Sequence, residues 1–104
     1  GNFVIPAGNY TIGKLTIDRR TRRVSLDGRQ INLTAKEFDL LSFLASDPGA
    51  VQSRTAILER VWDANWYGPT KTVDAHVAAV RKKLGDPRWI QAVRGVGFRF
   101  EEPV

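Results

Sequence analysis

The sequence predicts an α+β domain in which a sheet of short antiparallel strands is followed by three helices and a closing β-hairpin. Two patterns lead to this prediction. Over the first third of the chain apolar and polar residues alternate, which is the period of strands, whereas from about residue 34 to 84 apolar residues recur every three or four positions, which is the period of helices. With 104 residues, of which 42% are hydrophobic and 26% charged, the chain suffices for one domain with a modest core.

The composition excludes several classes of protein. Cysteine is absent, so disulfides, thiolate catalysis and cysteine zinc sites are excluded. No apolar run is long enough to cross a bilayer and no signal peptide opens the chain, so we expect a cytoplasmic protein with no membrane partner. The chain begins with Gly and lacks Met, as expected of a part of a longer protein. Residues 1–9 are interpreted as a linker or a non-native remnant, and residues 10–104 as the domain.

The predicted strands are separated by clear turn signals. Apolar residues stand two apart in three places: Leu15 and Ile17, Val24 and Leu26, and Ile31 and Leu33. Asp27-Gly28 supplies the positive φ angles of a tight hairpin turn. Four arginines between Arg19 and Arg23 mark another turn, which we interpret as solvated, because a cationic hairpin tip needs no partner.

Each predicted helix has its own start signal or stop signal. Thr34 and Glu37 form the capping box of the first helix, which ends at the Asp-Pro-Gly of residues 47–49. Ser53 is the expected N-cap of the second helix. The third helix is predicted from about Thr72 to Leu84, before the sequence Gly-Asp-Pro.

The third helix has an apolar face and an unusual opposite face. Its predicted buried stripe consists of Val73, Val77, Val80 and Leu84. The opposite face carries Lys71, Ala75, Ala78, Ala79 and Lys82. One flank carries Asp74 and Arg81, and the other carries Thr72, His76 and Lys83. Alanine allows close approach and contacts thymine methyl groups in a DNA major groove, where the lysines would straddle phosphates. Alanine also raises helix propensity on any surface, so this face alone leaves both interpretations open.

Residues 71–99 carry the whole net charge of the chain. They hold seven basic and two acidic side chains, and the resulting +5 equals the formal charge of all 104 residues. The predicted hairpin of Ile90–Arg94 and Phe98–Glu101 places Arg94 beside two glycines, so that backbone and guanidinium can approach a phosphate or a narrow minor groove. Glycines are common in hairpins, but a basic helix followed by a basic hairpin favours nucleic-acid binding over a merely solvated surface.

Five stretches in order make the chain resemble the winged helix-turn-helix DNA-binding domain of OmpR/PhoB-type response regulators, the output half of bacterial two-component systems. These stretches are Leu33–Leu41, Val61-Trp62, Thr72–Val77, Val80–Leu84 and Val93–Phe100. The resemblance covers roughly residues 10–101. It implies a four-stranded antiparallel N-terminal sheet, three helices and a C-terminal β-hairpin wing.

The resemblance also implies which residues meet double-stranded DNA. The helix of Ser53–Trp62 would position recognition helix 72–84 in the major groove, and wing 94–99 would reach the minor groove. The expected DNA-binding residues are Lys71, Thr72, Ala75, His76, Ala78, Ala79, Arg81, Lys82, Lys83, Arg94, Gly95 and Arg99. For His76, a half-buried packing role is an equal alternative. Ala78 and Ala79 stand where many relatives place Arg, Gln or Asn, and Ala92 where a Thr often donates to phosphate. We therefore expect more reliance on phosphates, thymine methyls and DNA shape than on base hydrogen bonds.

Further partners implied by the resemblance lie outside this chain. They are an N-terminal receiver domain, the sensor kinase that acts on it, and a second copy that pairs with the first on direct repeats. The segment Trp62–Pro69 matches the family segment thought to touch RNA polymerase subunits. Trp66 and Tyr67 are the candidates for that contact, whereas Trp62 is expected in the core.

Two other functions were weighed against DNA binding. A protein-interaction module would contact polymerase through the aromatic loop without reading DNA, and its binding would hardly change with salt. DNA binding through about five phosphates would instead give a log–log salt slope near −4.5. One histidine and no paired carboxylates leave little for catalysis, so we expect no enzyme, cofactor or metal. Membrane-tethered ToxR-like regulators share this output domain, and that alternative stays open.

Overall fold

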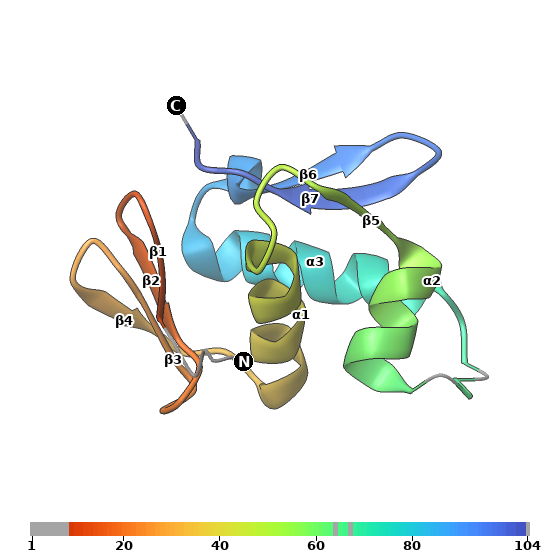
Figure 1. Cartoon of the computed structure of the whole chain (residues 1–104), viewed down its shortest axis with the longest axis horizontal. Coiled ribbons are helices and arrows are strands. Elements are labelled where there is room, and N and C mark those ends of the chain that lie inside the picture. The colour runs from red at the N-terminus through yellow and green to blue at the C-terminus, as the bar shows by residue number, and fades with distance from the viewer. Residues whose placement is uncertain (1–8, 64, 67, 104) are drawn as a thin grey trace, which may run out of the picture.

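The computed structural model describes residues 9–63, 65, 66 and 68–103, which form two antiparallel sheets around three helices (Figure 1). The first sheet contains, in spatial order, β1 (Asn9–Ile12), β2 (Leu15–Asp18), β3 (Arg23–Leu26) and β4 (Arg29–Ile31). The helices are α1 (Ala35–Ala45), α2 (Arg54–Ile57) with its π-helical continuation η2 (Leu58–Trp62), and α3 (Lys71–Leu84). The second sheet has the order β5 (Val51–Ser53), β7 (Gly97–Phe100) and β6 (Ile90–Val93), and the 3₁₀ turn η3 (Pro87–Trp89) leads into it. The predicted four-stranded sheet, three helices and closing hairpin are confirmed.

The N-terminal sheet follows the predicted alternation. Leu15, Ile17 and Val24 are buried on its inner face, and Asp27 and Gly28 have φ angles of 53° and 80°, as a tight hairpin turn requires. The domain begins one residue earlier than predicted, because Asn9 pairs with Asp18 in β1. Residues 1–8 lie outside the described residues, so their interpretation as a linker stays a prediction.

The arginine-rich turn between β2 and β3 is not simply solvated, which corrects our interpretation. The Arg22 guanidinium stacks 4.5 Å from the centroid of the Phe38 ring, and its Nη2 lies 3.0 Å from Asp39 Oδ1. Nη2 also donates to the carbonyl oxygen of Ala35. This turn is therefore fastened to the first two turns of α1, because its arginine reaches both an aromatic face and a carboxylate.

Both predicted helix caps are present. Glu37 Oε1 accepts the Thr34 amide at 2.9 Å, and Thr34 Oγ1 accepts the Glu37 amide at 3.2 Å, which is the capping box of α1. Ser53 Oγ accepts the Ala56 amide at 3.0 Å and caps α2. The second helix widens into a π-helical turn over its last five residues, which the periodicity did not predict.

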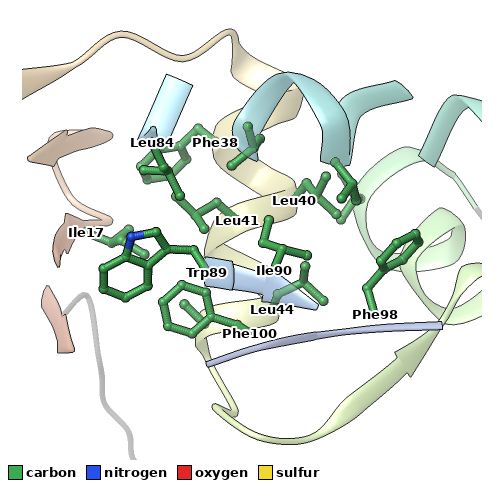
Figure 2. Packing of buried hydrophobic residues seen from close by; sticks show 14 of the residues in the cluster. Ile17, Phe38, Leu40, Leu41, Leu44, Leu84, Trp89, Ile90, Phe98 and Phe100 are labelled. Atoms are coloured by element: carbon green, nitrogen blue, oxygen red, sulfur yellow. The ribbon is translucent and has the colours of Figure 1, made fainter. Parts of the chain in front are cut away.

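The core joins α1 and α3 to the second sheet. Figure 2 shows Trp89 beside Phe100, and their rings stack with centroids 5.5 Å apart and planes at 26°. The apolar stripe of α3 is buried as predicted, with Val73, Val77, Val80 and Leu84 at most 3% exposed. Burial of this stripe turns the opposite face of α3 toward solvent.

Strand β5 was not predicted, and it explains one glycine of the hairpin. Ser53 pairs with Gly97 at the end of the β5–β7 ladder. A Cβ on Gly97 would lie 1.9 Å from the carbonyl oxygen of Gln52, so the close approach of β5 requires a glycine there. The close packing of β5 therefore accounts for Gly97, and its approach to phosphate stays a prediction. Gly95, with φ of +77°, makes the turn itself.

Candidate nucleic-acid interface

The face of α3 opposite the core is an exposed stripe of alanines that ends in a lysine on either side. Lys71, Ala75, Ala78 and Lys82 are exposed, and Ala79 beside them is half-buried. The four exposed positions follow one another at spacings of four, three and four residues, so they lie on one side of the helix. The Cα atoms of the two lysines are about 16 Å apart along the axis at 1.5 Å per residue. This surface can approach a groove closely with a cation at each end.

Four of the seven basic residues in 71–99 are already paired inside the protein. Lys83 Nζ lies 2.6 Å from Glu37 Oε1 in α1, and Arg81 Nε donates to the Ile90 carbonyl at 2.8 Å. Arg99 donates to Gln91 at 3.1 and 3.2 Å and lies 3.6 Å from Glu101 Oε1. The fourth is Arg88, which lies 2.9 Å from the carboxylate of Asp86. The structure therefore gives Arg81, Lys83 and Arg99 roles within the domain, and their contacts with DNA stay predictions.

The other three basic residues of this segment are Lys71, Lys82 and Arg94. None of them has a hydrogen-bond, ion-pair or ring partner among the described residues. All three side chains belong to exposed residues, two on α3 and one at the tip of the hairpin. The positive charge that remains unpaired in this segment therefore lies on the two elements that the sequence assigns to DNA.

The wing consists of β6, β7 and the turn between them. The Val96 amide donates to the Val93 carbonyl at 2.9 Å, and this places Arg94 and Gly95 at the tip. Val96 is 53% exposed, which is unusual for an apolar side chain and was not singled out from the sequence. In Figure 1 the wing lies beside α3, and the turn between β6 and β7 projects beyond β5.

His76 has the packing role that we kept as an alternative. Its Nδ1 lies 2.7 Å from the Thr72 carbonyl oxygen, and since a carbonyl only accepts, Nδ1 is the protonated nitrogen. The imidazole also meets the Trp62 ring edge-on, with centroids 4.8 Å apart. Trp62 is half-buried and packs against the core, as predicted. A contact of His76 and Thr72 with DNA stays a prediction.

Among the described residues of the aromatic loop, Trp66 leaves a large ring at the surface. Trp66 is 38% exposed and tilts against Trp62 with centroids 6.4 Å apart. Its indole nitrogen donates to the Pro69 carbonyl at 3.5 Å. Tyr67, the second candidate for a polymerase contact, lies outside the described residues.

One residue beside α3 was missed by the sequence analysis. Arg54, the first residue of α2, donates from Nε at 3.0 Å to Asp74 Oδ1 on α3, and its Nη2 lies 2.8 Å from the same oxygen as an ion pair. Its guanidinium also lies 4.8 Å from the centroid of Phe98 in β7. No pattern in the sequence could predict this contact, because the partners stand 20 and 44 positions away on separate elements.

Two carboxylates near the ends of α3 have lowered pKa values. Burial opposes ionisation of Glu37, but hydrogen bonds from Lys83 and from the Thr34 amide outweigh it, so the pKa of Glu37 falls below its ordinary value. The side-chain hydrogen bond from Arg88 lowers the pKa of Asp86. Both carboxylates are therefore ionised at neutral pH and hold cations of the basic segment.

The described residues show little sign of other chemistry. They contain no group of three or more His, Cys, Asp and Glu side chains that could hold a metal ion. A hollow of about 560 Å³ lies at the C-terminal end of α3, and its lining includes Lys14, Arg29, Asp86 and Trp89. Among the described residues, no helix is both long and apolar enough to span a membrane.

Comparison with known proteins gives the family of the chain. The family model for the C-terminal domain of transcriptional regulatory proteins matches residues 28–100. The uncharacterized transcriptional regulatory protein YclJ of Bacillus subtilis is 47% identical over 105 residues, which cover 98% of this chain and 46% of that protein. The transcriptional regulatory protein TrcR of Mycobacterium tuberculosis is 42% identical over 94 residues, which cover 88% of this chain and 37% of that protein. The chain thus spans less than half the length of these curated relatives.

Solved structures agree with the sequence relatives. The DNA-binding domain of Klebsiella pneumoniae RstA, in complex with the RstA box, is 33% identical with a TM-score of 0.81, over 89% of this chain and 96% of that chain. The response regulator DrrB, an OmpR/PhoB homolog of Thermotoga maritima, is 36% identical with a TM-score of 0.83, over 91% of this chain and 45% of that chain. Sequence, fold and the exposed basic face of α3 lead to one assignment: the chain belongs to the C-terminal family of transcriptional regulatory proteins and is a winged-helix DNA-binding domain of the OmpR/PhoB response-regulator type.

Proposed function

We propose that this domain recognises a specific site on double-stranded DNA, with α3 in the major groove and the wing at the neighbouring minor groove. The observation that supports this most is the alanine stripe of α3, flanked by two lysines that have no partner among the described residues. A major groove is about 12 Å wide, and the stripe spans about 16 Å. The lysines then fall near the phosphates on the two sides of the groove, while the methyl groups between them face the bases.

The unpaired cations define the electrostatic part of this proposal. Lys71 and Lys82 contact phosphates from α3, and Arg94 contacts the minor groove or its phosphates from the wing. Three contacts correspond to a log–log salt slope of about −2.7, shallower than the −4.5 expected from the sequence, at about 0.9 per neutralised phosphate. Arg81, Lys83 and Arg99 hold α3 and the wing in place in this proposal rather than neutralise phosphates.

Base recognition then depends on apolar contacts. The groups that α3 presents between its lysines are the methyls of Ala75 and Ala78, with Ala79 at the side. Methyl groups distinguish thymine from the other bases, and the minor-groove arginine responds to groove width. We expect a site rich in A·T pairs, read with modest discrimination by a single domain.

The experiment selects duplexes from a random-sequence pool at two salt concentrations and sequences the bound fraction. Enrichment of a short element, together with a salt slope of about −2.7 by anisotropy on that element, supports specific recognition. Salt-sensitive binding without enrichment would contradict sequence specificity, and no binding at low salt would contradict the proposal entirely. An Ala78→Glu domain, which places a carboxylate in the middle of the stripe, serves as the negative control.

The longer protein supplies the context of this binding. We propose that a receiver domain outside this chain, modified by a sensor kinase, pairs two copies on direct repeats. One isolated domain lacks that second contact and binds weakly, because the avidity of the pair is missing.

A second contact is favoured by one observation. Trp66 remains 38% exposed although its ring tilts against Trp62, and aromatic residues are enriched at protein interfaces. We propose that this loop contacts an RNA polymerase subunit. Trp66→Ala should leave DNA affinity and its salt slope unchanged and reduce transcription from a bound promoter. A parallel loss of DNA affinity would contradict a separate role for the loop.

A further inference from the structure

Two contacts made by arginines connect α3 to the wing. One lies at the base of the hairpin and the other near its tip. Arg81 Nε donates to the carbonyl of Ile90, the first residue of β6. That link holds the base of the hairpin, because Ile90 pairs with Phe100 at the end of the ladder farthest from the tip. It leaves the position of the tip to other contacts.

The second link passes through Arg54 and meets the hairpin near its tip. Nε of Arg54 donates to Asp74 Oδ1 in the first turn of α3, and Nη2 forms an ion pair with the same oxygen. The same guanidinium lies 4.8 Å from the centroid of Phe98, the second residue of β7. Figure 2 shows Phe98 apart from the pair of Trp89 and Phe100, on the side of α2. One planar group thus touches the recognition helix and the wing at once.

The strand that precedes Arg54 reinforces this link. Gln52 pairs with Phe98 and Ser53 with Gly97, and the backbone of residues 52 and 53 would touch any side chain on Gly97. The tip residues from 94 to 96 begin directly beyond this contact. A shift of Arg54 therefore moves the point from which the tip projects, whereas the base remains held by Arg81.

We infer that Arg54 is a positioning residue that sets where the wing tip stands relative to α3, and so allows Arg94 to reach the minor groove while α3 occupies the major groove. This inference rests on the proposed function. It assigns Arg54 a role that depends on shape as well as charge. Lysine offers a single ammonium in place of a planar guanidinium, so it cannot bond to Asp74 while a flat face lies against Phe98.

The test is a double-mutant cycle on DNA affinity between Arg54→Lys and Arg94→Ala. The Arg54→Lys variant has the same net charge as the parent, so counterion release on DNA binding is unchanged at this position. In the parent, Arg94→Ala should weaken binding about tenfold. In the Arg54→Lys background, the loss of affinity caused by Arg94→Ala should be smaller by a factor of at least about three, because the contact of the tip with DNA is already impaired. The Lys82→Ala loss should be equal in both backgrounds.

Arg60→Lys is the matched control. Arg60 lies in the same helical segment, is exposed, and stacks on Phe43 at 5.4 Å without an ion pair among the described residues. Its substitution should leave the Arg94→Ala loss unchanged. Asp74→Asn, which weakens the same link from the α3 side, should reproduce the coupling seen with Arg54→Lys. Thermal unfolding establishes that each variant is folded at the temperature of the binding assay.

The outcomes separate this inference from the proposed function. Two results would overturn the positioning role. One is that the losses of DNA affinity caused by Arg54→Lys and Arg94→Ala are additive. The other is that Arg60→Lys reduces the Arg94→Ala loss as much as Arg54→Lys does. Amide resonances of Gly95 and Val96 in the DNA-free protein give a second measurement, and they should shift with Arg54→Lys but not with Arg60→Lys. If they shift while the parent domain binds no duplex, the proposed function fails and the link between Arg54 and the wing stands. If they do not shift, the link itself is refuted.

Discussion

Lys82 and Lys83 are neighbours of equal charge, and the structure predicts opposite consequences for their loss. Lys82 has no partner among the described residues and belongs to the exposed stripe. Lys83 lies on the flank and is bonded to Glu37 at 2.6 Å. Substituting each by alanine removes one positive charge from the same turn of α3. The comparison therefore isolates where the charge stands rather than how much of it there is.

The expected magnitudes follow from the number of unpaired cations. With three phosphate contacts, affinity falls about 40-fold between roughly 50 and 200 mM salt. Lys82→Ala should reduce the slope by about 0.9, so that the same change in salt costs only about 12-fold. Lys83→Ala should keep the slope of the parent.

Stability should respond in the opposite way. Lys83→Ala leaves the 6% exposed Glu37 without its cation, which we expect to cost about 1 kcal/mol once the partial exposure of Lys83 is considered. For a domain of this size that corresponds to a fall of roughly 4–8 °C in the melting temperature. Lys82→Ala should change the melting temperature little, because Lys82 is exposed and has no hydrogen-bond or ion-pair partner among the described residues.

Fluorescence anisotropy over a salt series and thermal unfolding by circular dichroism measure the two quantities. A slope reduced equally by both substitutions would refute the division between paired and unpaired cations. An unchanged slope for Lys82→Ala would refute the assignment of the stripe to the groove.

Three further predictions follow from other contacts. Ala78→Glu should abolish DNA binding without lowering the melting temperature, since Ala78 is exposed and a helix tolerates glutamate; retained affinity would show that the stripe is not the binding face. Gly97→Ala should destabilise the fold by about 2 kcal/mol or more, because its Cβ would lie 1.9 Å from Gln52 O; an unchanged urea midpoint would contradict this close approach. Glu37→Gln keeps the cap but removes the charge, and should cost about 1 kcal/mol at pH 7. Because the folded-state pKa of Glu37 is lowered, its contribution is present above the ordinary value of 4.5 and disappears as the pH falls below that value. Urea unfolding at pH 7 and pH 3 should therefore show a smaller difference between the two proteins at the lower pH.

The structure shows which features of the chain the sequence could predict and which it could not. The exposed stripe of α3 was predictable because a helix repeats every 3.6 residues. Burial of the apolar stripe that begins at Val73 therefore decides which residues face outward. Strand β5 was not, since three residues show no alternation and its partner strand lies more than 40 positions later. The role of Arg54 was missed because its partners, Asp74 and Phe98, stand 20 and 44 positions away on separate elements.

Charge was the least predictable property of the site. Seven basic residues in one segment pointed to nucleic-acid binding but overstated the unpaired charge of that segment. Lys83 and Glu37 are 46 positions apart, so their pairing depends on the packing of α1 against α3. Only the fold distinguishes a cation that holds the domain together from one that can neutralise a phosphate.

The small number of unpaired cations bears on how such a domain reaches a single site in a genome. On the proposed function, three phosphate contacts and a few methyl contacts would provide modest affinity, and the nonspecific share of that affinity would be the same on any duplex. Two domains held on adjacent half-sites would act at an effective concentration in the millimolar range, so that the sequence preferences of the two domains multiply. A weak and weakly selective single domain is therefore an advantage for a regulator that is paired by a signal, because the unpaired form dissociates readily and the paired form does not. Strengthening the stripe, for example with Ala79→Arg, should raise the affinity of the single domain and reduce its dependence on pairing.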